Sequence, residues 1–227
     1  ISRVARQPVE LTGAGRTDAG VHGWGQVVTC DLPETVDLGG LVRRVNKLCA
    51  PDIAVREPEW VDADFDARFS ATWRQYRYHV WNDPVPNPLV ARTAWHVAQP
   101  LDVRMMQAGV APLIGEHDFT SFCRKPKMPP DVPPASLVRI LHEIEWRRVD
   151  DTPMLRMEIR ASAFCHQMVR AVTGTLVDVG AGKLTPADVN GILRAKDRNL
   201  AGSFAPPHGL VLWAVGYDGR RWDDSGP

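Results

Sequence analysis

A glycine-rich run near the start of the chain, residues 13–22, carries the side chains best suited to chemistry. It places the carboxylate of Asp18 in the middle of a tight turn, two positions after the guanidinium of Arg16. Glycines let a backbone bend sharply and let a ligand approach it closely. Two interpretations of Asp18 follow: it stabilises the turn through nearby backbone groups, a common role of aspartate, or it is presented as a reacting group. On this run alone the turn-forming role is favoured.

Phosphate binding is the first chemistry that a glycine-rich turn indicates, and the sequence argues against it. A dinucleotide-binding fingerprint that begins at Gly13 requires glycine where Asp18 stands, and a P-loop requires a Gly-Lys-Ser/Thr ending that is absent here. A carboxylate that points into a phosphate cradle would also repel the ligand. The chemistry therefore rests on Asp18 itself, since carboxylates serve as covalent nucleophiles toward sugar carbons.

The composition bounds the class of protein. At 227 residues the chain is long enough for one large domain or two small ones, and 44% hydrophobic with 24% charged residues is typical of a soluble globular protein. A continuous apolar run of about 18 residues, which a membrane-spanning helix needs, is absent. The cysteines at positions 30, 49, 123 and 165 lack C-x-x-C spacing, so neither a zinc site nor a redox pair is predicted. Scattered cysteines are expected in a reducing cytoplasm.

The charge distribution argues against nucleic-acid binding over the whole surface but is compatible with binding at a local basic patch. The formal net charge is zero, yet cations gather in short stretches without acids between them. A neutral protein with such basic patches can bind a polyanion on one face, while the alternative is ordinary solvated surface. The predicted phosphate contacts are Arg68, Arg74, Arg77, Arg124 and Lys125.

The elements that must position these residues are a mixture of helices and strands. The alternation of Tyr76, Arg77 and Tyr78 predicts a strand with the two tyrosines on one face and the arginine on the other. Two further strands, 137–146 and 154–159, are predicted to form an antiparallel pair. The strand of the two tyrosines is predicted to span 75–81, and further strands are predicted at 26–32, 53–55 and 210–217. Helices are predicted at 38–48, 101–113, 163–179 and 185–196, a proline-rich loop at 125–134 and a polar tail at 219–227.

The helix predicted at 163–179 combines an apolar stripe with two polar residues. Phe164 and Met168 begin the stripe, and Gly180 is expected to end the helix. His166 and Arg170, four positions apart, are expected together on a different face. Taken with the antiparallel strands, this pattern predicts the α+β class.

The run Gly15-Arg16-Thr17-Asp18-Ala19-Gly20-Val21-His22 resembles the signature of the TruA family of tRNA pseudouridine synthases. Further segments resemble the other motifs of that family in the same order along the chain: 52–55, 65–72, 76–78, 115–122, 164–170 with Gly174, 195–198 and 205–210. This ordered set of motifs is far more specific than any one of them. Two departures stand out: the family's initial strand with a Tyr-Asp-Gly segment is absent, so the N-terminus is expected to be missing, and the loop at 125–134 is unusual.

The resemblance implies the pseudouridine synthase fold, in which two ferredoxin-like halves share a mainly antiparallel sheet with a central cleft. The halves are expected at 1–62 and 63–218, followed by the tail 219–227; the first would supply Asp18 and the second Tyr76 and Arg170. The implied activity is isomerisation of uridine to pseudouridine at positions 38–40 of the tRNA anticodon stem-loop. The resemblance implies neither cofactor nor metal, tRNA and a second copy of the chain as partners, no membrane and a cytoplasmic location.

By the same resemblance, each candidate residue has a role. Asp18 is the nucleophile that attacks the sugar or the base, Arg170 pairs with it, and Tyr76 stacks on the target base and helps to move its proton. Arg16 holds the target nucleotide out of its stack. The substrate-binding set adds His166, Arg68, Arg77 and Arg124 to these, and His22 supports the turn. Without the motifs, Arg170 would be interpreted as a surface arginine and Tyr76 as core packing.

Two other functions remain as alternatives. A non-catalytic RNA-binding module with the same halves would bind RNA without forming product. An unrelated hydrolase with an aspartate nucleophile, such as a phosphatase, would depend on a metal ion, and the absence of a second carboxylate clustered beside Asp18 argues against it.

Overall fold

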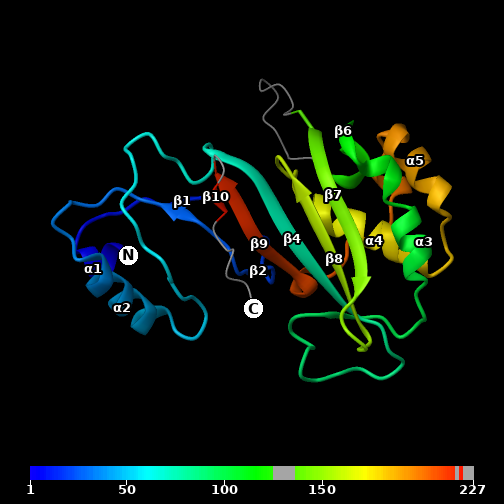
Figure 1. Ribbon diagram of the computed structural model, residues 1–227, viewed down its shortest axis with the longest axis horizontal. Helices are drawn as coiled ribbons and strands as arrows, with labels where there is room; N and C mark the ends of the chain where they lie inside the picture. Colours follow the sequence, from blue (N-terminus) through cyan, green and yellow to red (C-terminus); the bar gives the residue numbers. More distant parts are fainter. Residues whose placement is uncertain (125–135, 218–219, 222–227) are drawn as a thin grey trace. The chain divides into compact units, whose positions relative to one another are not determined.

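The computed structural model of the chain describes residues 1–124, 136–217 and 220–221 (Figure 1). The chain forms two compact units, the first made of residues 1–16 and 27–71 and the second of residues 17–26 and 72–227. Residues 17–26 therefore group with the C-terminal part of the chain, whereas the sequence placed Asp18 in the first half. The boundary near residue 62 remains a prediction.

The first unit contains short elements around one amphipathic helix. They are α1 (Ser2–Ala5), α2 (Leu38–Cys49) and an antiparallel pair of two-residue strands, β1 (Thr12–Gly13) and β3 (Val28–Thr29). Helix α2 lies where the periodicity predicts it, with Leu41 and Val45 buried. The strand predicted at 26–32 is reduced to β3, and residues 53–55 form no strand. The side chain of Asn46 hydrogen-bonds both the N–H and the C=O of Val55, so these groups are not available to a strand ladder.

The second unit is built on a sheet whose strand order is β10-β9-β4-β8-β7-β6. The pairs β4–β8, β8–β7 and β7–β6 are antiparallel, whereas β2 joins β9 and β5 joins β4 in parallel. The α+β class with a mainly antiparallel sheet is thus confirmed. The strands are β2 (His22–Gly23), β4 (Ala71–Trp81), β5 (Trp95–His96), β6 (Gly115–Asp118), β7 (Val138–Arg148), β8 (Met154–Ala161), β9 (Leu210–Tyr217) and β10 (Arg220–Arg221).

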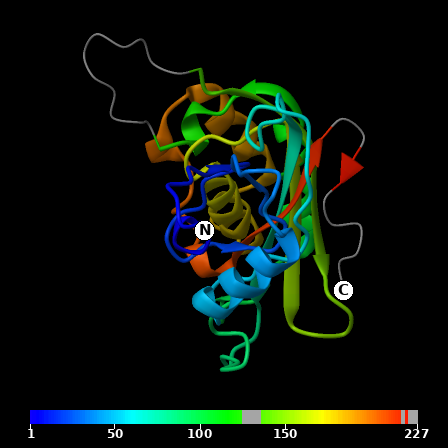
Figure 2. The same cartoon turned by 90° about the vertical axis from the view of Figure 1, so that its left-hand side faces the viewer.

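Helices cover one face of this sheet, as Figure 2 shows for α4 and α5. The α-helices are α3 (Val103–Ala108), α4 (Met168–Gly180) and α5 (Pro186–Ala195), and the short 3-10 turns are η1 (Ala111–Leu113), η2 (Thr120–Phe122), η3 (Arg198–Leu200) and η4 (Pro207–Gly209). Helix α5, predicted at 185–196, begins directly after Thr185, which forms a capping box with Asp188. No helix of the described ranges is both long enough and apolar enough to cross a membrane.

Two predicted helices differ in their bounds from those observed. The helix expected at 101–113 is divided into α3 and η1, since Pro112 lacks the N–H that an uninterrupted helix would need there. The helix expected at 163–179 begins only at Met168, because Gln167 has a φ of 62°, outside the helical region. His166 therefore lies in the turn before α4, not on the same helix as Arg170.

Candidate active site

The turn that carries Asp18 is closed by backbone groups. The N–H of Val21 donates to the carbonyl oxygen of Asp18 at 3.0 Å, and Gly20 at the third position has a φ of 84°. A positive φ at this position is typical of a type II turn and favours glycine. Because the carbonyl of Asp18 closes the turn, its carboxylate remains for other contacts.

The chain leaving this turn is fixed to the sheet. His22 and the next residue form β2, which pairs with Val211 and Leu212 of β9. The Nε2–H of His22 donates to the carbonyl oxygen of Arg92 at 2.9 Å. This hydrogen bond reaches outside the turn, and with β2 it anchors the chain on the C-terminal side of the turn; the role of His22 in supporting the turn itself stays a prediction.

The carboxylate of Asp18 meets two nitrogen groups from the region around the start of α4. The Nη1–H of Arg170 donates to Oδ2 at 2.9 Å, and Nε2 of His166 lies 3.4 Å from Oδ1. The Asp18 and Arg170 side chains are 26% and 13% exposed, so the pair is partly shielded from water yet still reachable. Such shielding strengthens the interaction compared with a surface ion pair. The fold thus brings together residues that are 152 positions apart in the chain.

Tyr76 lies on the same side of β4 as the helices and is buried. Its ring meets that of Phe164 edge-on, with the centroids 5.1 Å apart. Burial raises the pKa of Tyr76 to about 12, and the negative charge of Asp18 contributes in the same direction while Arg74 opposes it. Tyr76 is therefore a neutral phenol at physiological pH, electrostatically coupled to Asp18. Phe164, which the sequence assigned to the apolar stripe of a helix, is a site residue that sequence reasoning missed.

Arg170 has a second anchor in the loop that precedes β9. Its Nε–H donates to the carbonyl oxygen of Ala205 at 2.7 Å, and the N–H of Ala205 donates back to the carbonyl of Arg170 at 3.0 Å. The hydroxyl of Tyr78, whose ring is buried in the core, donates to the carbonyl of Pro206 at 2.7 Å. The role of this loop was not predicted, although the resemblance included its motif at 205–210.

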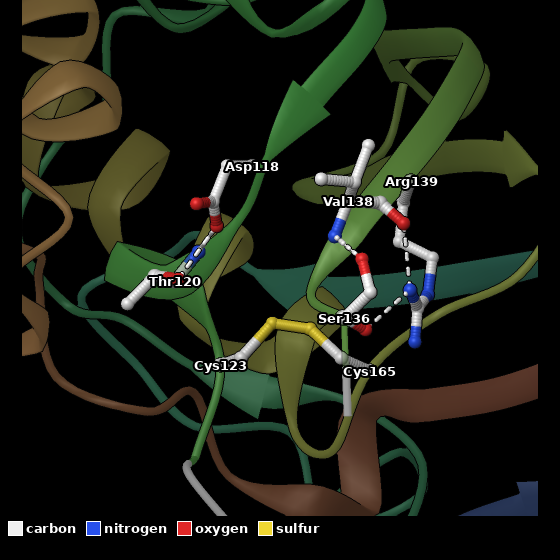
Figure 3. The surroundings of a disulfide bond; sticks show 7 residues. All are labelled: Asp118, Thr120, Cys123, Ser136, Val138, Arg139 and Cys165. Atoms are coloured by element: carbon white, nitrogen blue, oxygen red, sulfur yellow. Dashed lines mark hydrogen bonds between the residues drawn. A yellow bond between two sulfur atoms is a disulfide. The ribbon is translucent and has the colours of Figure 1, made fainter. Parts of the chain in front are cut away.

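A disulfide joins Cys123 to Cys165, next to His166 (Figure 3). Their Cα atoms are 5.8 Å apart, although 42 positions separate the two residues in the chain. The N–H of Arg124 also donates to the carbonyl of His166 at 2.9 Å. The prediction that the cysteines form no redox pair is therefore wrong, because the fold and not a C-x-x-C spacing brings these two together. In the described part of the chain, no group of three or more His, Cys, Asp or Glu residues could hold a metal ion.

The other predicted substrate-binding residues differ in their surroundings. Arg77 faces the opposite side of β4 from Tyr76, where it pairs with Glu158 at 3.2 Å and lies 3.5 Å from the ring centroid of Trp213. Arg124 is exposed beside the disulfide. Arg74 donates a hydrogen bond to the carbonyl of Ser162. Arg16 and Arg68 are exposed residues of the first unit. Lys125 and the loop 125–134 lie outside the described residues.

Comparison with known proteins places this arrangement in context. A family model described as tRNA pseudouridine synthase matches residues 110–218. The tRNA pseudouridine synthase A of Bacillus velezensis is 42% identical over 210 residues, which are 92% of this chain and 82% of that protein. The proteins of the same name from Bacillus subtilis and Pectobacterium atrosepticum are each 40% identical, over 94% and 97% of this chain and 84% and 75% of their own lengths.

Proposed function

Since this chain belongs to the tRNA pseudouridine synthase A family and is thus a tRNA uridine isomerase, we propose that it acts at positions 38–40 of the anticodon stem-loop with Asp18 as its nucleophile. The observation that carries the proposal is the Asp18 carboxylate, left unused by its own turn and held at 2.9 Å by Arg170. A carboxylate whose only task was to stabilise the turn would bond backbone groups of that turn.

The reaction sets clear demands on such a site. The bond between N1 of the base and C1′ of the sugar breaks, the base turns, and a new bond joins C5 to C1′ while C5 loses its proton. An anion next to the sugar can stabilise or capture the electron-poor carbon that forms. Asp18 is suited to that role, whether it attacks the sugar or the base. The substrate is rearranged without net oxidation, so the reaction itself needs no redox partner.

Tyr76 is proposed to pack against the target base and to help move the C5 proton. Its phenol is neutral at physiological pH, and the raised pKa widens that margin, so the phenol can donate a hydrogen bond. Its ring is held edge-on by Phe164, which fixes the plane on which a base would stack.

The tRNA contacts are proposed from exposed cations. The target uridine must leave its stack, which costs a few kcal/mol, and the exposed Arg16 is proposed to hold it out. Arg68 and Arg124 are proposed to bind phosphates, and His166 to contact the substrate beside Asp18. Arg77 is excluded from this set, because Glu158 and Trp213 already engage its guanidinium.

A homodimer in the cytoplasm completes the proposal. A chain of zero net charge presents only local basic patches, and two copies would combine these patches along one tRNA. Light scattering at several protein concentrations tests the dimer: a mass twice the chain's 25.2 kDa supports it, and a monomer at all concentrations contradicts it.

The test of the activity uses unmodified tRNA transcripts and mass spectrometry of their fragments. The chain is expected to form pseudouridine at positions 38–40, and matched transcripts with cytidine at these positions should remain unmodified. Pseudouridine elsewhere in the tRNA would contradict the proposed site. Binding of tRNA without any product would instead favour a non-catalytic RNA-binding module.

A further inference from the structure

The guanidinium of Arg170 is planar, so two contacts determine where it points. Its Nη1 faces Asp18, and its Nε–H donates to the carbonyl oxygen of Ala205 at 2.7 Å. If that carbonyl moved, the guanidinium would rotate and Nη1 would leave the carboxylate. The geometry of the Asp18–Arg170 pair therefore depends on what holds residues 201–206 in place.

Arg198 makes the contacts that hold this loop. Its Nη1 donates to the carbonyl of Ala201 at 3.1 Å, and its Nη2 donates to the carbonyl of Gly202 at 2.8 Å. Its guanidinium carbon lies 4.0 Å from the ring centroid of Phe204, the residue directly before Ala205. The carbon of the Arg170 guanidinium lies 5.8 Å from the same ring. One ring thus links the two arginines.

The environment of Arg198 differs from that of a surface arginine. Within the ranges that the structure describes, it forms no ion pair, and its Nε is buried without a hydrogen-bond partner. Compensation for its partial burial therefore comes from two carbonyl oxygens, those of Ala201 and Gly202, and from the ring of Phe204. Among the described residues its guanidinium thus contacts the loop 201–204 and no carboxylate.

The opposite side of the loop is packed against α4, one turn after Arg170. The N–H of Gly202 donates to Oγ1 of Thr175 at 2.9 Å, and a Cβ added at Gly174 would overlap the carbonyl oxygen of Ser203. The loop therefore lies between α4 and Arg198. Removal of Arg198 would leave it attached by α4 and by the Tyr78 hydroxyl, which bonds the carbonyl of Pro206 at the far end of the loop.

We propose that Arg198 is a positioning residue for uridine isomerisation: it clamps residues 201–206 so that the carbonyl of Ala205 aims Arg170 at Asp18. This inference rests on the proposed function, in which the Asp18–Arg170 pair performs the reaction. Arg198 itself touches neither member of the pair through a hydrogen bond, and its effect passes through Ala205.

The test compares Arg198→Met with Arg194→Met, a matched change of an exposed arginine on α5. Single-turnover formation of pseudouridine at saturating enzyme is expected to slow ~10- to 100-fold in Arg198→Met, the range expected when a reacting group is misplaced by about 1 Å. The Kd for tRNA should stay within about 2-fold of wild type, and Arg198→Lys should recover part of the rate. Arg194→Met should behave as wild type.

A double-mutant cycle separates positioning from a general structural role. In an Arg170→Lys background the side chain has no Nε–H directed at Ala205, so adding Arg198→Met should slow the reaction by less than about 2-fold. A full ~10- to 100-fold slowing by Arg198→Met in the Arg170→Lys background would overturn the proposal, as would a weakened Kd of Arg198→Met with an unchanged single-turnover rate.

If Asp18→Asn keeps full activity in the same assay, the proposed function has failed. If Asp18→Asn is inactive and Arg198→Met matches Arg194→Met, only this inference has failed.

Discussion

Replacing Arg170 with alanine would leave the Asp18 carboxylate with His166, at 3.4 Å, as its remaining partner among the described contacts. At 2.9 Å and an effective dielectric constant of about 20, the lost Coulomb attraction is about 6 kcal/mol before solvent compensates. Water can reach the 26%-exposed Asp18, so we expect a net loss of about 2–4 kcal/mol. If that loss appears in the transition state, the rate falls ~30- to 1,000-fold.

The assay for this change is single-turnover formation of pseudouridine, with the Kd for tRNA measured separately by filter binding. The rate is expected to fall by the range above while the Kd changes by less than about 3-fold, because Arg170 faces Asp18 and Ala205 rather than the solvent. Arg194→Ala serves as the control, since this arginine is exposed on α5. A variant that binds tRNA weakly but reacts at the wild-type rate would refute the reasoning.

Three other changes test separate parts of the account. The phenol of Tyr76 has a pKa of about 12 in the folded chain and near 10 in the unfolded chain, so its contribution to stability is complete below pH 10 and is lost as the pH rises to 12. Urea unfolding should therefore show that, between pH 9 and pH 11, wild type loses about 1.4 kcal/mol more free energy of unfolding than Tyr76→Phe. Equal losses would contradict the raised pKa. Gly20→Ala forces a side chain onto a φ of 84° and toward Pro207, so it should lower the free energy of unfolding by about 1–2 kcal/mol and reduce activity, whereas Gly191→Ala, in open space on α5, should not destabilise. Thiol titration of the denatured chain should find two reactive cysteines without reductant and four with it; four without reductant would contradict the Cys123–Cys165 bond.

The regular elements could largely be predicted from periodicity. The helix α2 and the strands β4, β7 and β8 lie at or near their predicted positions, because each has one more buried face that imposes a 3.6- or 2-residue pattern. Strand β9 also lies where it was predicted, although nearly all of its residues are buried. The start of α4 was wrong by five residues, since no periodic signal records the single positive φ at Gln167. Short strands such as β3 also escape a pattern that needs several residues to appear.

The site depended on information that local patterns do not contain. Periodicity left Asp18 as a turn residue, and only the ordered motifs of a known family connected it with Arg170, 152 positions away. Phe164 and the loop carbonyl of Ala205 were missed because an aromatic residue beside a helix and a backbone oxygen carry no distinctive sequence signal. The Cys123–Cys165 pair was missed for the same reason, since its 42-residue spacing matches no motif.

The most direct test of the central claim is the single-turnover rate of Asp18→Asn on unmodified tRNA. Asparagine keeps nearly the same shape and can still bond Arg170 through its carbonyl oxygen, but it cannot act as an anionic nucleophile. We expect Asp18→Asn to bind tRNA with a Kd within about 3-fold of wild type and to form no detectable pseudouridine. Pseudouridine formation by Asp18→Asn at the wild-type rate would contradict it.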